Sequence, residues 1–275
     1  MSEQNPFEKN ERPIPAAWTN NPFKAPTAHV EDARSAGDGS LASEPNRVGA
    51  GQGSAWWSGG WGLFREATGL WIGMSVVLLI LIMIINLIPV AGSLAVNIFM
   101  PVISGGLMLG CRSIEDGEGL SFGHLFAGFQ KNFGQLALVG LLYLVGVVVI
   151  VLGVVALGVG GGISAAMMGG ASSGAGFTTF LLAGLLGLAL GIPLAMSMRV
   201  APALVALNDL TAVAAMKLSF QGSLRNMVPF LIYGVIGLVL AIVASIPFGL
   251  GWLALIPTMI CSTYVSYKEI FVAQD

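Results

Sequence analysis

The stretch QLALVGLLYLVGVVVIVLGVVAL, residues 135–157, contains no Asp, Glu, Lys or Arg. At about 1.5 Å per residue, a helix of this length crosses the ~30 Å hydrocarbon core of a bilayer. Hydrophobic residues make up 55% of the chain and charged residues only 9%, against about 25% charged residues in soluble domains. We therefore expect an all-α integral membrane protein. The sequence predicts about six transmembrane helices, at residues 70–89, 94–111, 135–157, 177–198, 227–246 and 250–267.

The charged residues all fall on one side of the predicted membrane. The connections at residues 90–93, 158–176 and 247–249 carry no Asp, Glu, Lys or Arg. All 12 Lys and Arg and all 14 Asp and Glu lie in the other connections or toward the two ends of the chain. Positive charge is retained in the cytoplasm during membrane insertion. We therefore predict a multi-pass protein of the cytoplasmic (inner) membrane with both termini in the cytoplasm.

The N-terminal region differs in composition from the rest of the chain. Residues 1–53 are rich in Pro, Gly, Asn and Ala, which predicts a disordered cytoplasmic tail before a transmembrane domain of residues 54–275. The tripeptide Asn-Pro-Phe occurs at residues 5–7 and again at residues 21–23. It is either an echo within a biased tail or a short docking peptide for a protein partner. The net charge of −2 gives no indication of a nucleic-acid partner.

Two parts of the chain match each other at fixed spacing. Residues 126–132, FAGFQKN, match residues 220–226, FQGSLRN, at the Phe, the Gly, the cation and the Asn. Gly62 and Arg65 keep the glycine and the cation in an earlier copy. We therefore predict an internal repeat of three units. Each unit is a cytoplasmic amphipathic helix followed by a hairpin of two transmembrane helices.

The apolar positions before the second hairpin are spaced for one helical face. Phenylalanines at positions 122, 126, 129 and 133 recur at i, i+4, i+7 and i+11. Such a helix can lie at the membrane surface, with rings at acyl depth and cations at lipid phosphates. It can equally pack inward as a collar over the bundle. The first placement makes membrane lipid a partner and predicts lipid-headgroup contacts at Arg65, Lys131 and Arg225.

The sequence holds no recognisable catalytic or ligand-binding motif. Its two histidines, His29 and His124, form no HExxH pattern, and GxSxG and CxxC patterns are missing. Cys111 and Cys261 are expected to be reduced, buried thiols. We therefore assign no catalytic, cofactor-binding or metal-binding residue and expect no cofactor and no enzymatic activity.

The predicted spans also hold no ionisable side chain in their interiors, which argues against transport of protons or ions. Two functions remain. The first is a non-enzymatic scaffold or accessory module in membrane or lipid homeostasis. The alternative is a transporter or permease for an uncharged or lipid-like solute.

Two further features receive structural interpretations. Arg199 and Asp209, which flank Ala201-Pro202, are expected to pair across a short cytoplasmic connection. Gly187 and Gly191 form a GxxxG pattern, which serves either compact packing within the chain or contact between copies of it. The sequence does not decide the oligomeric state.

Several motifs resemble those of a known group of proteins. Gly59-Gly60-Trp61 before Phe64-Arg65, LMLGCR at 107–112 and GHLF at 123–126 resemble an uncharacterised family of bacterial integral inner-membrane proteins. More distantly, the repeated Phe-x-Gly-x-x-cation-Asn hairpin is similar to the membrane domain of glycerophosphodiester phosphodiesterases. In those enzymes the chemistry belongs to a separate soluble domain. The resemblance implies location and architecture, and it implies no activity or site residues.

Overall fold

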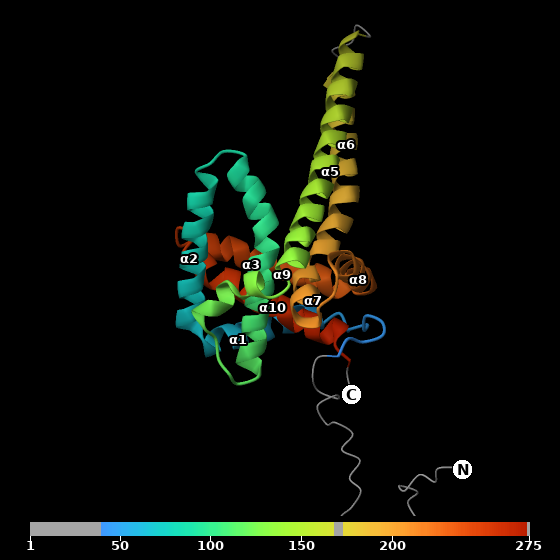
Figure 1. Cartoon of the computed structure of the whole chain (residues 1–275). Coiled ribbons are helices and arrows are strands. Elements are labelled where there is room, and N and C mark those ends of the chain that lie inside the picture. Colours follow the sequence, from blue (N-terminus) through green and yellow to red (C-terminus); the bar gives the residue numbers. More distant parts are fainter. Residues whose placement is uncertain (1–39, 168–172, 274–275) are drawn as a thin grey trace, which may run out of the picture. The chain divides into compact units, whose positions relative to one another are not determined.

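A computed structural model describes residues 40–167 and 173–273 (Figure 1). Within these residues the chain is helical, and its one extended pairing is an isolated bridge between Leu41 and Val272. The predicted all-α integral membrane fold is confirmed. The helices are α1 Gln52–Glu66, α2 Thr68–Asn86, α3 Ala91–Glu115, η2 Phe122–Leu125, α4 Ala127–Gln130, α5 Phe133–Met167, α6 Ser173–Met198, α7 Ala201–Asn208, α8 Ala212–Arg225, α9 Met227–Ser245 and α10 Trp252–Phe271.

Each predicted transmembrane stretch falls on one helix of the structure. In the described part of the chain, five helices are long and apolar enough to cross a membrane: α2, α3, α5, α6 and α9. The remaining one, α10, is more polar and carries Lys268 and Glu269 in its last turn. The connection expected at 158–176 is shorter than predicted, because α5 continues to Met167 and α6 begins at Ser173. Glycine-rich sequence can continue a helix in apolar surroundings, where backbone groups need internal partners.

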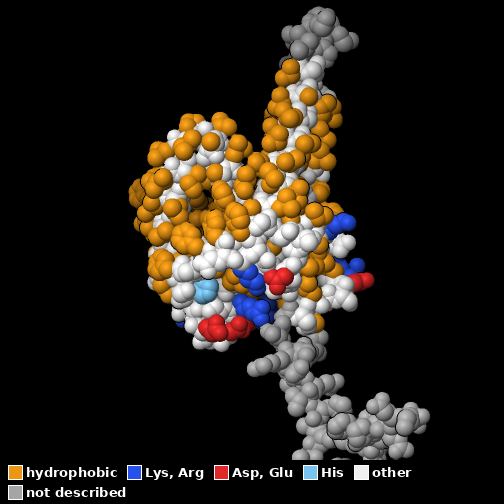
Figure 2. Space-filling model, in the orientation of Figure 1, with side chains coloured by type: hydrophobic (Ala, Val, Ile, Leu, Met, Phe, Trp, Pro, Cys, Tyr) orange, Lys and Arg blue, Asp and Glu red, His pale blue; other side chains and the backbone are white. Residues whose placement is uncertain are grey.

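The charged side chains gather at one end of the molecule. Figure 2 shows hydrophobic side chains covering the helical hairpins, while Lys, Arg, Asp and Glu lie at the end opposite the hairpin tips. We call this the charged end. Hydrophobic side chains facing outward are expected where lipid replaces water around a protein. The arrangement agrees with charges on one side of a membrane, and the cytoplasmic orientation of that side stays a prediction.

Each short amphipathic helix packs mainly on a hairpin other than the one that follows it. α1 precedes α2 and α3 but packs on α9 and α10. The η2–α4 segment precedes α5 and packs on α3, whereas α8 precedes α9 and packs on α6. Each amphipathic segment therefore packs on the hairpin that precedes it in the chain, and the first one, α1, packs on the last hairpin. Three repeated units would give this order, although the internal repeat itself stays a prediction.

α1 packs inward as a collar rather than lying on the surface. Trp56, Trp57 and Phe64 are buried. The ring of Trp57 stacks on that of Tyr233 with centroids 4.7 Å apart, and Trp56 Nε1 donates to Glu269 Oε2 at 2.7 Å. The large apolar area that these rings bury fixes α1 against α9 and α10. Of the two placements predicted for such helices, α1 takes the inward one.

The amphipathic helix expected at residues 122–133 is interrupted. Its residues form two single turns, η2 and α4, and Asn132 then adopts a positive φ of 58° before α5 begins. The four phenylalanines are nevertheless exposed, and three of their rings are neighbours: Phe129 lies 6.3 Å from Phe126 and 5.7 Å from Phe133 between ring centres. The Asn132 side chain donates to Val205 O on α7 at 3.0 Å. The phenylalanines therefore form an exposed apolar surface although the segment is not a continuous helix.

The structure corrects the expected disordered tail over residues 40–53. This segment runs along the C-terminal end of α10, where Ala42 N donates to Phe271 O at 2.9 Å. α1 then begins at Gln52. Carbonyl groups at the end of a helix lack partners within it, so hydrogen bonds to them can order a segment with few apolar side chains. Residues 1–39, with both Asn-Pro-Phe sequences, lie outside the described residues.

Asn226, between α8 and α9, holds this segment in place. Its Oδ1 accepts from Val48 N at 2.9 Å, and its Nδ2 donates to Asn46 O at 2.8 Å. The side chain is buried. Arg225 beside it lies 2.7 Å from Glu44. The segment that leads from the N-terminal region is therefore fastened to the corner between α8 and α9.

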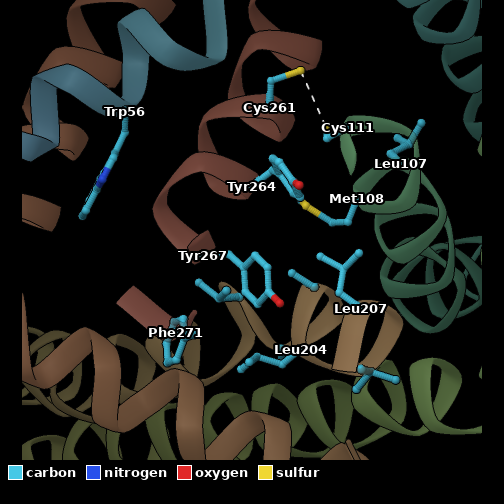
Figure 3. Close-up of a cluster of buried hydrophobic side chains, with 14 of the residues drawn as sticks. Trp56, Leu107, Met108, Cys111, Leu204, Leu207, Cys261, Tyr264, Tyr267 and Phe271 are labelled. Atoms are coloured by element: carbon cyan, nitrogen blue, oxygen red, sulfur yellow. Dashed lines mark hydrogen bonds between the residues drawn. The ribbon is translucent and has the colours of Figure 1, made fainter. Parts of the chain in front are cut away.

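The buried core lies at the charged end, where α3, α7 and α10 meet (Figure 3). Tyr264 OH donates to Glu115 Oε2 at 2.7 Å, which ties α10 to α3. Cys111 and Cys261 are free and buried, as expected, with their Sγ atoms 3.7 Å apart. This core supports the ends of the helices that form the candidate site.

Candidate functional site

The three cations predicted to contact lipid headgroups lie on different elements at the charged end. Arg65 is in the last turn of α1. Lys131 Nζ lies 3.9 Å from Asp209 Oδ1, and Arg225 Nη1 lies 2.7 Å from Glu44 Oε2. Both pairs are largely exposed and therefore contribute little to stability. The side chains of Lys131 and Arg225 are partly neutralised, and headgroup contact by the three cations stays a prediction.

A groove of about 870 Å³ lies between the second hairpin and the start of the third. This volume is within the ~300–1,000 Å³ typical of small-molecule sites. Its walls come from α5, α6, α8 and α9, and most of its lining side chains are apolar. The lining residues are Tyr143, Ile192, Ala195, Met196, Met198, Arg199, Ser223, Met227, Val228, Phe230 and Leu231.

The rim of the groove opens onto the apolar outer surface of the hairpins. Ile192 is 55% exposed, Val228 57% and Leu231 67%. These residues belong to helices that are long and apolar enough to cross a membrane. Exposed aliphatic side chains on such helices face acyl chains rather than water. The groove therefore opens sideways to lipid.

Arg199 is the one charged residue among those that line the groove within the described part of the chain. Its Cζ lies 4.7 Å from the centre of the Phe230 ring and 4.3 Å from that of the Tyr233 ring. Aromatic faces attract a guanidinium and stabilise it where water is excluded. Its Nε and Nη2 atoms are buried and have no hydrogen-bond partner among the described residues. A buried donor without an acceptor is costly, so these two atoms mark a site for an acceptor.

The chain ends α6 at this point for a local reason. Pro202 in the first turn of α7 has no N–H to donate to a carbonyl one turn earlier, which favours a break in the helix here. Ser219 on α8 satisfies the freed groups: its Oγ donates to Met196 O at 2.8 Å and accepts from Val200 N at 3.1 Å. The break and the serine together hold Arg199 at the mouth of the groove.

The pairing of Arg199 with Asp209 expected from the sequence is wrong. α7 occupies the residues between them, and its eight residues rise by about 12 Å. Asp209 instead accepts a hydrogen bond from Asn132 Nδ2 at 2.6 Å and lies beside Lys131. Sequence analysis therefore missed Arg199 as a site residue. The available signal was an arginine that directly follows an apolar stretch without an ionisable residue.

Two hydroxyl groups share the groove with the guanidinium. Tyr143 on α5 and Ser223 on α8 both line it. Ser223 Oγ donates to Met196 O over a long 3.4 Å, which leaves the oxygen able to accept another hydrogen bond. An apolar cavity with a few convergent polar groups is the usual form of a ligand site. In the residues that the structure describes, no group of three His, Cys, Asp or Glu side chains is placed to hold a metal ion.

Comparison with known proteins supports a bacterial membrane protein. The chain is similar to a relative from Burkholderia thailandensis named "Probable inner membrane protein", with 28% identity over 256 residues. The similarity covers 83% of this chain and 94% of the relative. No protein-family model matches the chain, and no solved structure matches it. The distant resemblance to the membrane domain of glycerophosphodiester phosphodiesterases therefore gains no support.

Proposed function

We propose that the protein is a non-enzymatic accessory module of the inner membrane that holds a lipid molecule in the groove beside Arg199. The observation that carries the proposal is the groove itself, which is open sideways through exposed aliphatic side chains. A ligand that enters from the hydrocarbon must itself be amphipathic or apolar. Membrane lipid meets this condition and surrounds the protein at high concentration.

The position of the groove favours holding a lipid over passing a solute across the membrane. The lining from α6 and the residue that follows it runs from Ile192 to Arg199, a rise of about 10 Å. Its α9 lining lies in the first turn of that helix, from Met227 to Leu231. Both stretches are at the charged end, and their extent matches one leaflet rather than a whole bilayer. The alternative of a permease for a lipid-like solute is thus the weaker proposal.

A protein partner at the N-terminal region forms the second part of the proposal. Residues 40–48 are fastened to Asn226 and Arg225, which immediately precede the groove residues Met227 and Val228. A partner that binds the Asn-Pro-Phe sequences would therefore be linked, through residues 40–48, to the start of α9, which forms one wall of the groove. This arrangement supports a module that couples bound lipid to another protein.

The proposal is tested by filling the groove with a larger side chain. Val228 and Val235 are both on α9 and equally exposed, but only Val228 lines the groove. Wild type, Val228→Trp and Val235→Trp would be extracted into lipid nanodiscs, released in the gas phase and weighed by native mass spectrometry. We expect wild type and Val235→Trp to retain one lipid per chain and Val228→Trp to lose it. Equal retention by all three proteins, or no retained lipid on wild type, would refute the groove as a lipid site.

A further inference from the structure

We propose that the groove selects an anionic phospholipid, whose phosphate accepts hydrogen bonds from the Arg199 guanidinium. This inference rests on the proposed function and adds the chemical class of the ligand. Its starting point is the charge balance of the groove. Of the described residues that line it, one carries a positive charge and none is Asp or Glu.

The uncompensated charge of Arg199 determines which ligand the site needs. A charge in apolar surroundings is costly unless it is paired and hydrogen-bonded. The rings of Phe230 and Tyr233 supply part of the missing stabilisation, but they accept no conventional hydrogen bond from Nε or Nη2. A phosphate oxygen supplies both the acceptor and the negative charge. A neutral lipid such as a diacylglycerol supplies neither charge nor a matching oxyanion.

Arginine is suited to this role for geometric reasons. Its planar guanidinium presents N–H donors in a fork that fits two oxygens of one phosphate group. Stacking against aromatic rings limits the orientations of the plane, so less entropy is lost when the phosphate binds. Tyr143 adds a hydroxyl group on a neighbouring wall, which can donate to a remaining phosphate oxygen, and Ser223 can donate to one only in place of its long hydrogen bond to Met196 O.

The order of polar and apolar residues along the groove matches the orientation of a lipid in a leaflet. Arg199 lies at the charged end, where headgroups lie. Ala195 and Ile192 follow along α6 toward the hairpin tips, and Val228 and Leu231 face them from α9. A phospholipid with its phosphate at Arg199 would therefore place its acyl chain against apolar walls. A free phosphate ion would leave those walls uncovered, so we commit to the phospholipid.

The selectivity is tested by competition in native mass spectrometry. Wild type, Arg199→Gln, Arg199→Lys and the control Lys217→Gln, which removes an exposed cation of α8 outside the groove, would each be equilibrated with equimolar phosphatidylglycerol and phosphatidylethanolamine. We expect wild type and Lys217→Gln to retain phosphatidylglycerol in about tenfold excess. Both lipids offer the same phosphate acceptor, but only phosphatidylethanolamine brings an ammonium group, which would lie near Arg199 with no Asp or Glu among the described lining residues to pair it. Arg199→Lys keeps the charge and should keep part of the excess, whereas Arg199→Gln should bind both lipids equally. Added inorganic phosphate should displace neither lipid.

The outcomes separate this inference from the proposed function. A wild-type protein that retains one lipid without headgroup preference contradicts the inference and leaves the proposed function standing. A wild-type protein that retains no lipid contradicts both. An excess that is unchanged in Arg199→Gln assigns the selectivity to another cation and overturns the role of Arg199. If Arg199→Gln does not fold, the wild-type ratio and the response of Arg199→Lys still decide the question.

Discussion

The guanidinium of Arg199 lies over the ring of Tyr233, with Cζ 4.3 Å from the ring centre. Two further contacts hold the Tyr233 side chain in place: its ring stacks on that of Trp57, and its hydroxyl oxygen lies 2.7 Å from Ser262 Oγ. The position of the cation at the end of α6 therefore depends on α1, α9 and α10. These helices meet because the first amphipathic helix packs on the last hairpin.

This relationship predicts that the ring of Tyr233 matters more than its hydroxyl. Tyr233→Leu removes the aromatic face and should reduce the preference for anionic lipid several-fold, because a cation–π contact is worth about 0.5–2 kcal/mol. Tyr233→Phe keeps the face and serves as the matched control. Lipid competition in native mass spectrometry measures the ratio of bound phosphatidylglycerol to bound phosphatidylethanolamine. An equal loss of the preference for anionic lipid in the two variants would show that the ring does not position Arg199.

The Asn226 clamp should contribute to stability. Asn226→Ala leaves Val48 N and Asn46 O without their partners, and each unsatisfied buried group costs about 1–3 kcal/mol. We expect a clear fall in the free energy of unfolding, which denaturant titration in detergent would measure. Asn86→Ala is the control, because Asn86 is exposed and bonds only within its own helix. A fall of the same size in the control would refute the clamp.

Gly128 should tolerate no larger residue. A Cβ atom at Gly128 would collide with the backbone carbonyl of Val102 on α3. Gly128→Ala must therefore push α4 away from α3, at a cost of about 1–3 kcal/mol. Gly134→Ala, at the start of α5, meets open space and should be neutral or slightly stabilising. Thermal unfolding of the two variants distinguishes these results, and a stable Gly128→Ala would contradict the close approach of the two helices.

The two thiols should resist modification in the folded protein. Cys111 and Cys261 are both fully buried in the core between α3 and α10. We expect maleimide to label neither in the native protein within minutes and both after denaturation, as counted by intact mass. Rapid labelling of native Cys261→Ala or Cys111→Ala would show that the remaining thiol is exposed and that this core is open.

The helical architecture follows from the sequence because it depends on local patterns. The apolar run at 135–157 predicts the membrane-crossing part of α5 but not its continuation to Met167, and the absence of charge from the hairpin tips predicts which ends lie together. The amphipathic pattern also locates α1 and α8. It could not say that α1 packs inward, because Trp57 is equally suited to a lipid interface and to the stack with Tyr233.

The candidate site could not be derived from the sequence because it depends on contacts between distant residues. Arg199 and Phe230 belong to different hairpins, and the short separation between Arg199 and Asp209 favoured a local ion pair that α7 prevents. The ordered segment at 40–53 was missed for a related reason. Its order comes from hydrogen bonds to the far end of the chain, as in the bond from Asn46 N to Ile270 O, and not from its own apolar content.

The most direct test of the account is an experimental density map of the protein in nanodiscs that contain phosphatidylglycerol. The account predicts an elongated density between α6 and α9 that runs past Ile192 and Leu231 and ends in a strong headgroup feature at the Arg199 guanidinium. A groove that is empty, or closed by its own side chains with Arg199 paired to a carboxylate of the chain, would contradict it.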